Sequence, residues 1–273
     1  METAGSGPEP RVVCDVAEGV ATVVIRHPAK RNAMTTAMWR TVPVLLERLA
    51  ADPAVRVLVL TGEGDTFCAG ADISSLRGPG DAPDSGADPR TPQELAVVAE
   101  EALAAFPKPA LAEVRGYCVG GGCQLAAVCD LRFAAADAWF GVTPARLGVV
   151  YPPSSTRRLV ELVGPSAAKY LLFSGELIDS ARALRTGLVD EVLPPADLGP
   201  RVAAFARILA GRSQLTQVAA KEFAAGRPGV ADRADRVAHW AAVAAEQARP
   251  GGDTAEGVAA FLERRTPRFT WTG

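Results

Sequence analysis

The chain has 273 residues, enough to bury a core as one large domain or as a domain with a helical appendix. Its 29 Lys and Arg residues nearly balance 31 Asp and Glu residues, so the charge gives no sign of nucleic-acid binding. No apolar run approaches the roughly 20 residues that span a bilayer. Residues 1–10 lack the basic start and apolar segment of a secretory signal, and we expect a loose tail there.

The first half of the chain alternates strand and helix signals. Alternating apolar residues around Glu18-Gly19 predict a β-hairpin, and Thr35 or Thr36 is suited to cap the first helix. The expected elements are strands at 12–16 and 20–26, a helix ending near residue 51, a strand at 55–61, a helix at about 92–105 and a strand at 109–114. Residues 74–93 are rich in Gly, Pro, Asp and Ser and predict a long loop.

The stretch 116–130 is predicted to be a strand, a glycine turn and a helix that begins near Gly121. A helix start presents free backbone N–H groups and the positive end of the helix dipole. Three consecutive glycines would let a ligand approach that backbone closely. The turn therefore suits a carbonyl oxygen that becomes an oxyanion. The alternative is that the glycines only allow the helix to pack closely on its strand.

The second half continues the rhythm and then turns helical. The expected elements are a strand at 131–135, helices at about 155–163 and from 164–166 onward, a strand at 188–193, and helices at about 201–211, 213–225, 232–248 and 254–265. Repeated strand–turn–helix units predict an α/β protein with roughly parallel strands.

The five cysteines do not have the spacing of a zinc site, and the chain has only two histidines. We expect reduced, buried thiols, a cytoplasmic location and no metal site. Cys118 and Cys123 flank the glycine turn, but no histidine motif supports a nucleophilic role.

Five pieces of the sequence, in this order, resemble the enoyl-CoA hydratase/isomerase, or crotonase, superfamily: 31–34 (Arg-Asn-Ala-Met), 67–73 (Phe-Cys-Ala-Gly-Ala-Asp-Ile), 116–130, 147–148 and 256–264. The resemblance covers about residues 11–269. It implies the crotonase (ClpP-like) fold, with repeated ββα units as a core over 11–199. It also implies a C-terminal helical region over 200–273 that assembles a homotrimer or a dimer of trimers.

The resemblance implies that an acyl-CoA thioester binds, with coenzyme A as part of the substrate and no separate cofactor. The oxyanion donors would be the N–H groups of Ala71 and Gly121. The thioester would contact Ala69, Ala71, Asp72, Ile73 and Gly121, and the CoA nucleotide would lie along Arg31 and Ala33. The alternative for Arg31 is a solvated surface charge. The loop at 74–93 would cover the acyl pocket as a lid, or would be plain disorder.

The chain departs from the family pattern at both acid–base positions. Gln124 stands where the hydratases have one glutamate, and Pro144 stands where they have the other. An amide cannot titrate, and each lost acid–base role is typically worth about 10²–10⁴-fold in rate. We therefore expect weak hydration, or none.

Three functions stay open at this point. The chain could stabilise a thioester enolate as an enzyme of this family. It could decarboxylate a malonyl-type acyl-CoA, because Tyr151 resembles a tyrosine of the methylmalonyl-CoA decarboxylases; that branch, however, has a histidine at the place of Ala71. It could also bind acyl-CoA without turnover. The alternative for Tyr151 is a core tyrosine. Arg146 is expected to pair with Asp72, with Asp130 or with an acidic acyl group. The basic residues after 263 are expected to form a solvated helix end or to contact a CoA phosphate.

Overall fold

A computed structural model describes residues 9–72, 90–224 and 230–272. Two sheets organise these residues. The larger has the order β1-β2-β3-β4-β6-β9 and the smaller the order β5-β7-β8. The strands are β1 (Arg11–Ala17), β2 (Val20–Arg26), β3 (Val57–Gly62), β4 (Ala110–Val114), β5 (Tyr117–Val119), β6 (Leu131–Ala135), β7 (Trp139–Gly141), β8 (Ile178–Asp179) and β9 (Glu191–Leu193). The α/β class predicted from the sequence is confirmed.

The larger sheet starts with the predicted hairpin and continues in parallel. Strands β1 and β2 pair antiparallel, and Gly19 at their turn has φ +80°, a conformation that suits glycine. From β2 to β9 each neighbouring pair is parallel. The last strand is shorter than predicted, because only Glu191–Leu193 pairs with β6.

The predicted helices appear in the expected order, and the helix at Ser180–Thr186 is an additional one that was not predicted. The helices are α1 (Thr36–Ala51), α2 (Pro92–Ala104), α3 (Gly121–Val128), α4 (Pro153–Ser174), α5 (Ser180–Thr186), α6 (Pro195–Ala210), α7 (Gln214–Ala224), α8 (Val230–Gln247) and α9 (Asp253–Glu263), with short 3-10 turns η1 (Pro28–Lys30) and η3 (Pro144–Arg146). Thr35 caps α1 by accepting from Met38 N, as predicted. Thr91 and Glu94 form a capping box that fixes the start of α2.

Two helix boundaries differ from the sequence expectation. Helix α4 runs through both predicted helices, with a break at Gly164, where φ is +76° and ψ is 163°. Helix α6 begins at Pro195, so the predicted division between residues 199 and 200 falls inside it. Leu198, Val202 and Ala206 of α6 are buried against the larger sheet.

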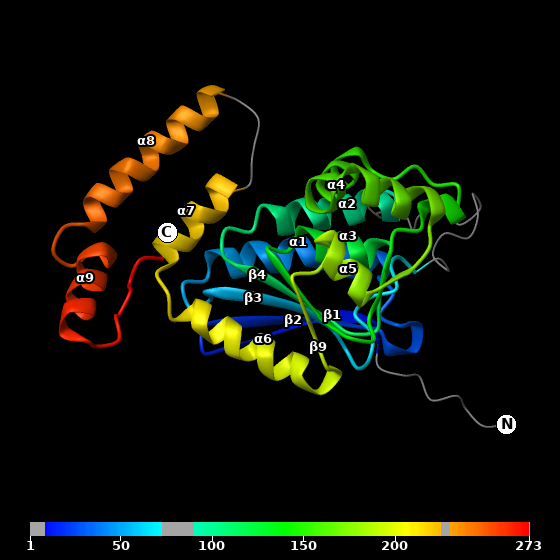
Figure 1. The fold of residues 1–273 in the computed structure, drawn as a ribbon, viewed down its shortest axis with the longest axis horizontal. Coiled ribbons are helices and arrows are strands. Elements are labelled where there is room, and N and C mark those ends of the chain that lie inside the picture. The colour runs from blue at the N-terminus through cyan, green and yellow to red at the C-terminus, as the bar shows by residue number, and fades with distance from the viewer. Residues whose placement is uncertain (1–8, 73–89, 225–229, 273) are drawn as a thin grey trace.

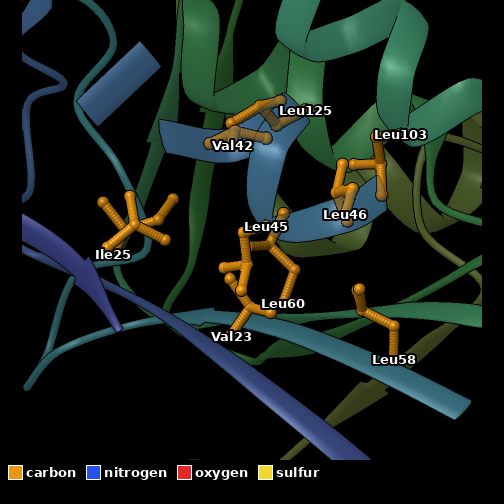
Figure 2. A pocket seen from close by; sticks show the side chains of 10 residues that line it. Val23, Ile25, Val42, Leu45, Leu46, Leu58, Leu60, Leu103 and Leu125 are labelled. Atoms are coloured by element: carbon orange, nitrogen blue, oxygen red, sulfur yellow. The ribbon is translucent and has the colours of Figure 1, made fainter. Parts of the chain in front are cut away.

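The larger sheet carries helices on both faces. Figure 1 shows α1, α2 and α3 on one side and α6 on the other, with α8 and α9 set apart from these layers. Between α1 and the sheet lies a small pocket lined only by apolar side chains, among them Leu45, Leu60 and Leu125 (Figure 2). It has no polar group that could orient a substrate, so it is a packing defect of the core.

In the part of the chain that the structure describes, no helix is both long enough and apolar enough to cross a membrane. No cluster of His, Cys, Asp and Glu side chains in those same residues has the arrangement of a metal site.

Candidate active site

The loop at Gly70 lies directly against the start of α3. Val119 N donates to Cys68 O at 2.9 Å, which joins the two stretches by their backbones. A Cβ on Gly70 would lie 3.0 Å from Val119 O and 3.4 Å from Gly121 N. Gly70 also has φ +99°. Glycine is required here both for its backbone conformation and for the close approach.

Two backbone N–H groups at this contact have no acceptor among the residues that the structure describes. Among the described residues, neither Ala71 N nor Gly121 N donates to another backbone group. A Cβ on Gly121 would lie 3.9 Å from Ala71 N, so the two groups are neighbours. Gly121 is the first residue of α3, where N–H groups lack an intrahelical acceptor and the helix dipole is positive. This pair suits an oxygen that gains negative charge.

The segment 31–34 is bonded to the same loop. Ala69 N donates to Arg31 O at 3.0 Å, and Met34 N donates to Gly70 O at 2.8 Å. The side chain of Asn32 is fully buried and donates to the backbone oxygens of Glu63 and Thr66. Three stretches that the sequence analysis singled out therefore meet at one place.

A buried polar network surrounds Gln124, one helical turn after Gly121. Its Nε2 donates to Glu100 Oε2 and, at 3.0 Å, to Ser155 Oγ. The hydroxyl of Ser155 also donates to Glu100 Oε2. Glu100, Gln124 and Ser155 are 1%, 6% and 3% exposed and come from α2, α3 and α4.

Arg158 balances the charge of Glu100. Its Nη1 donates to Glu100 Oε1 at 2.8 Å, and its Nη2 donates to Glu101 Oε2 at 2.6 Å. The hydrogen bond from Arg158 is the main cause that lowers the pKa of Glu101. Glu100 accepts from three donors on two oxygens, so protein groups satisfy much of its hydrogen-bonding capacity.

The sequence matches the enoyl-CoA hydratase/isomerase family over residues 15–272. The chain belongs to this family. It is 34% identical over 259 residues to a crotonyl-CoA hydratase of Syntrophomonas wolfei, covering 94% of this chain and 97% of that one. It is 35% identical over 263 residues to a 2,3-dehydroadipyl-CoA hydratase of Escherichia coli, covering 92% and 94%. A crystal structure of an enoyl-CoA hydratase from Bacillus anthracis superposes with TM-score 0.83 at 26% identity, covering 95% and 98%. The family and fold inferred from the sequence are confirmed.

Tyr151 lies beside the Gln124 network. It is half-buried and packs against the main core cluster. Burial raises the pKa of Tyr151 well above its usual value, and the neighbouring Cys123 and Glu100 raise it further. Its hydroxyl therefore stays protonated at neutral pH and can donate a hydrogen bond.

The expected ion pairs of Arg146 are wrong. Arg146 is exposed on η3, next to Pro144. Asp72 pairs instead with Lys30 Nζ at 2.8 Å, and Asp130 pairs with Lys221 Nζ at 2.8 Å. Both lysines come from elements that pack on those carboxylates, which leaves Arg146 at the surface.

Arg31 and Ala33 differ in their surroundings. Ala33 is 8% exposed. Arg31 has φ +51°, and its guanidinium lies 4.9 Å from the ring centroid of Tyr117, so part of its charge meets an aromatic face. Ile73, the last residue expected at the substrate, lies outside the described residues, as does most of the predicted loop at 74–93.

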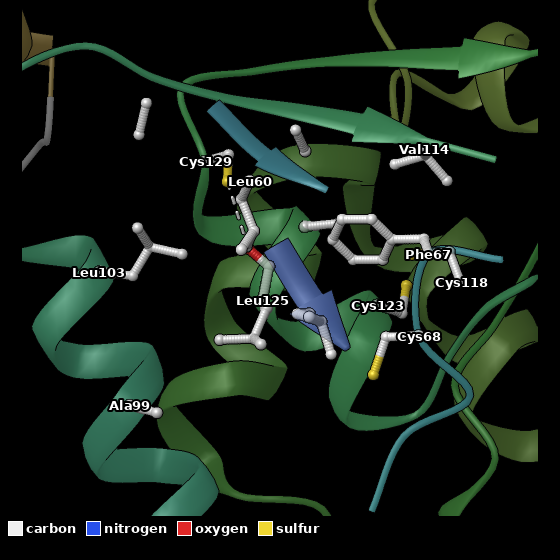
Figure 3. Close-up of a cluster of buried hydrophobic side chains, with 14 of the residues drawn as sticks. Leu60, Phe67, Cys68, Ala99, Leu103, Val114, Cys118, Cys123, Leu125 and Cys129 are labelled. Atoms are coloured by element: carbon white, nitrogen blue, oxygen red, sulfur yellow. Dashed lines mark hydrogen bonds between the residues drawn. The ribbon is translucent and has the colours of Figure 1, made fainter. Parts of the chain in front are cut away.

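The thiols are free, as predicted, and four of the five are buried. Figure 3 shows Cys68, Cys118, Cys123 and Cys129 among apolar side chains. Burial raises the pKa of Cys68 and of Cys129 to about 12. Burial also raises the pKa of Cys118 well above its ordinary value, so this thiol is protonated at neutral pH, which supports the expectation that Cys118 is not a nucleophile.

The basic end of the chain is held by local ion pairs. Arg265 Nη1 contacts Glu256 Oε1 at 2.6 Å, and Arg268 N donates to the same oxygen at 2.6 Å. The hydrogen bond from Arg265 lowers the pKa of Glu256 to about 2. These contacts favour the helix-end interpretation over binding of a CoA phosphate.

Sequence analysis missed Glu100, Ser155 and Arg158. A signal was present in α2, because Glu100 lies on the face that carries the buried Leu95, Ala96, Ala99 and Leu103. A carboxylate on an apolar helix face needs partners and is therefore a candidate for a polar network. The residues that supply those partners are 24, 55 and 58 positions away.

Proposed function

We propose that the protein binds an acyl-CoA thioester and holds its carbonyl oxygen between the N–H groups of Ala71 and Gly121. The observation that carries this proposal is the pair of neighbouring backbone donors for which the described part of the chain offers no acceptor. Each such preorganised donor stabilises a developing oxyanion by on the order of 3 kcal/mol. The arrangement suits a thioester enolate, in which negative charge collects on that oxygen.

The neighbouring segments complete the binding site in this proposal. Arg31 and Ala33 would lie along the CoA nucleotide, because their segment is bonded to the loop that contains Gly70. Ala69, Asp72 and Ile73 would line the path from the nucleotide to the thioester. The relatives from Syntrophomonas wolfei and Escherichia coli are named as hydratases of acyl-CoA compounds, which supports a CoA thioester as the ligand.

A ligand pair tests the oxyanion donors without altering the protein. Butyryl-CoA has the thioester oxygen, whereas S-butyl-CoA, a thioether of the same chain length, lacks it. We expect calorimetric titration to show butyryl-CoA binding at least about tenfold more tightly, the worth of two hydrogen bonds of about 1 kcal/mol each, less some desolvation. Equal affinities, or no binding at millimolar concentration, would overturn the proposal.

Efficient hydration is not expected from this site. Gln124 and Pro144 cannot transfer a proton, and Glu100 already accepts from three protein donors. We expect the purified protein to hydrate crotonyl-CoA at background rate beside a two-glutamate hydratase as control. A rate within about a hundredfold of that control would show that another group supplies the acid–base chemistry.

Tyr151 keeps the decarboxylase alternative open. Its protonated hydroxyl lies within electrostatic reach of Glu100 and could orient a substrate carboxylate. Decarboxylation needs an oxyanion site and an oriented carboxylate but no strong base. The test is a panel of malonyl-type thioesters with wild type and Tyr151→Phe. An unchanged rate in the variant would end this alternative, and no turnover of any thioester that binds would leave a non-catalytic acyl-CoA binder.

The proposed assembly is a homotrimer or a dimer of trimers. Helix α9 exposes the large apolar side chains Phe261 and Leu262, which are 84% and 74% exposed in the single chain. Apolar groups of this size on one helix suit a subunit contact. Light scattering coupled to gel filtration would give the mass, and a monomer would contradict this proposal.

A further inference from the structure

Cys68 is bonded through its backbone to the strand that leads into α3. Cys68 N donates to Tyr117 O and Val119 N donates to Cys68 O, each at 2.9 Å. Both bonds go to β5, and Figure 3 shows the side chains of Cys68 and Cys118 side by side. Strand β5 ends at Val119, two residues before Gly121. The backbone of Cys68 therefore helps to determine where the N–H of Gly121 lies.

The thiol of Cys68 contacts both polar backbone groups of Gly70. Gly70 N donates to the sulfur at 3.4 Å, and the sulfur donates to Gly70 O at 3.8 Å. Burial raises the pKa of Cys68 to about 12, so the sulfur keeps its proton at neutral pH. A protonated thiol is a weak donor and a weak acceptor, and Cys68 uses both capacities on one residue.

The carbonyl group of Gly70 determines the direction of the N–H group of Ala71. The two groups belong to one peptide unit, which is planar and trans, so they point in opposite directions. Gly70 O is held by Met34 N at 2.8 Å and by the thiol of Cys68. The N–H of Ala71 consequently points away from those two groups. Rotation of this peptide unit would break both bonds to Gly70 O.

Cys68 also packs against the first turn of α3. A Cβ on Gly122 would lie 2.4 Å from Cys68 O and 2.7 Å from Cys68 Cβ, so the backbone of Gly122 touches this cysteine. Gly122 directly follows the second donor, Gly121. Cys68 therefore lies between the loop that carries Ala71 N and the turn that carries Gly121 N.

We propose that Cys68 is a positioning residue of the oxyanion site, in which its thiol fixes the direction of the Ala71 N–H and its backbone and Cβ fix the spacing to the Gly121 N–H. This inference rests on the proposed function, because it takes the thioester oxygen to lie between those two donors. Cys68 is 0% exposed and acts only through the backbone that it holds. Its sulfur serves as donor and acceptor toward Gly70, so a hydroxyl group can take its place.

The test measures how much more tightly butyryl-CoA binds than S-butyl-CoA, by calorimetric titration of the full chain. The two ligands differ only in the carbonyl oxygen, so the ratio of their affinities reports on the oxyanion donors and not on the other contacts. We expect the wild-type ratio, at least about tenfold, to fall about twofold to fivefold in Cys68→Ala, which removes the thiol and keeps the Cβ. Cys68→Ser keeps a donor and an acceptor for the nearby backbone, and it should retain the wild-type ratio.

Cys129→Ala is the matched control. Cys129 is also buried, and its sulfur donates to Leu125 O at 3.5 Å instead of to Gly70. Each alanine variant loses one buried sulfur and its hydrogen bonds, so both should lose similar stability in urea. Only Cys68→Ala should change the affinity ratio. A thiol with a merely structural role would change the stability and leave the ratio at its wild-type value.

Gly122→Ala perturbs the same contact from the side of α3. Its methyl group would push the first turn of the helix away from Cys68 without altering the thiol. We expect this variant also to lower the affinity ratio, and it replaces Cys68→Ala if that variant does not fold. An unchanged ratio in Gly122→Ala would contradict the spacing role of Cys68.

The outcomes separate this inference from the proposed function. Equal affinities of wild type for the two ligands overturn the proposed function and the role of Cys68 with it. A wild-type ratio of about tenfold that is unchanged in Cys68→Ala, or that falls equally in Cys129→Ala, overturns the role of Cys68 and leaves the oxyanion site intact. A ratio in Cys68→Ser as low as that in Cys68→Ala would contradict the role of the two hydrogen bonds to Gly70.

Discussion

Replacing Gln124 by glutamate is expected to destabilise the protein, although it introduces the residue that the hydratases have at this place. The new carboxylate would lie in direct contact with Glu100, which is fully buried. Two like charges about 4 Å apart repel by about 4 kcal/mol at an effective dielectric constant of 20. Arg158 offsets part of this repulsion, so we expect a loss of about 2 to 4 kcal/mol in the free energy of unfolding at pH 7.

The loss should depend on pH in one direction. Repulsion raises the pKa of a carboxyl group in the folded state above its unfolded value of about 4.3. Below that value both states are protonated and the variant is close to wild type. As the pH rises toward the folded pKa, the unfolded state ionises first, and the variant loses stability relative to wild type. Urea unfolding at about pH 3 and at pH 8 would measure both limits.

The exchanged pair Glu100→Gln with Gln124→Glu is the control for this prediction. It has the same atoms and the same total charge as wild type but the carboxylate on α3 instead of α2. We expect it to recover most of the stability that Gln124→Glu loses. The reasoning is refuted if Gln124→Glu is as stable as wild type at pH 8, or if the exchanged pair is no better than the single variant.

Three further outcomes are expected. Gly122→Ala should lower the free energy of unfolding by about 1 to 3 kcal/mol in urea titrations, because its Cβ would lie 2.4 Å from Cys68 O. Arg265 lowers the carboxyl pKa of Glu256 to about 2, so their ion pair should stabilise the end of α9 above about pH 4.3. This stabilisation should be lost as the pH falls toward 2, and limited proteolysis of the C-terminus would detect the loss. Titration of the native protein with a thiol reagent at pH 8 should modify at most Cys14, with the other thiols reacting only in denaturant.

Local signals explain which parts of the fold the sequence predicted. The turn at Gly19, the cap at Thr35 and the glycine run before α3 each depend on a few consecutive residues, and the structure has the corresponding elements at those places. Parallel strands with intervening helices then bring the loop at Gly70 to the start of α3. The contact between those segments follows from the topology that the family pattern implied.

The polar network could not be derived in the same way. Contacts among Glu100, Gln124 and Ser155 join three helices, and their geometry depends on how α2, α3 and α4 pack. The sequence shows only that a carboxylate lies on an apolar face and that a glutamine replaces a glutamate. The structure connects those two observations, because a carboxylate on α2 is compatible with an amide at position 124 and unfavourable beside a second carboxylate.

The charge of this network also bears on which acyl group the pocket accepts. Glu100 and Glu101 share Arg158, so the three side chains together carry one net negative charge. A malonyl-type carboxylate placed near Tyr151 would be repelled by it, whereas a neutral acyl group would not. We expect malonyl-CoA to bind less tightly than its terminal methyl ester. The difference in affinity between the two ligands should decrease in Glu100→Gln, which removes one negative charge. It should increase at low ionic strength if salt reaches the ligand site, because salt screens the repulsion. Tighter binding of malonyl-CoA than of the ester would contradict this electrostatic argument and would favour decarboxylation over the binding of neutral acyl chains.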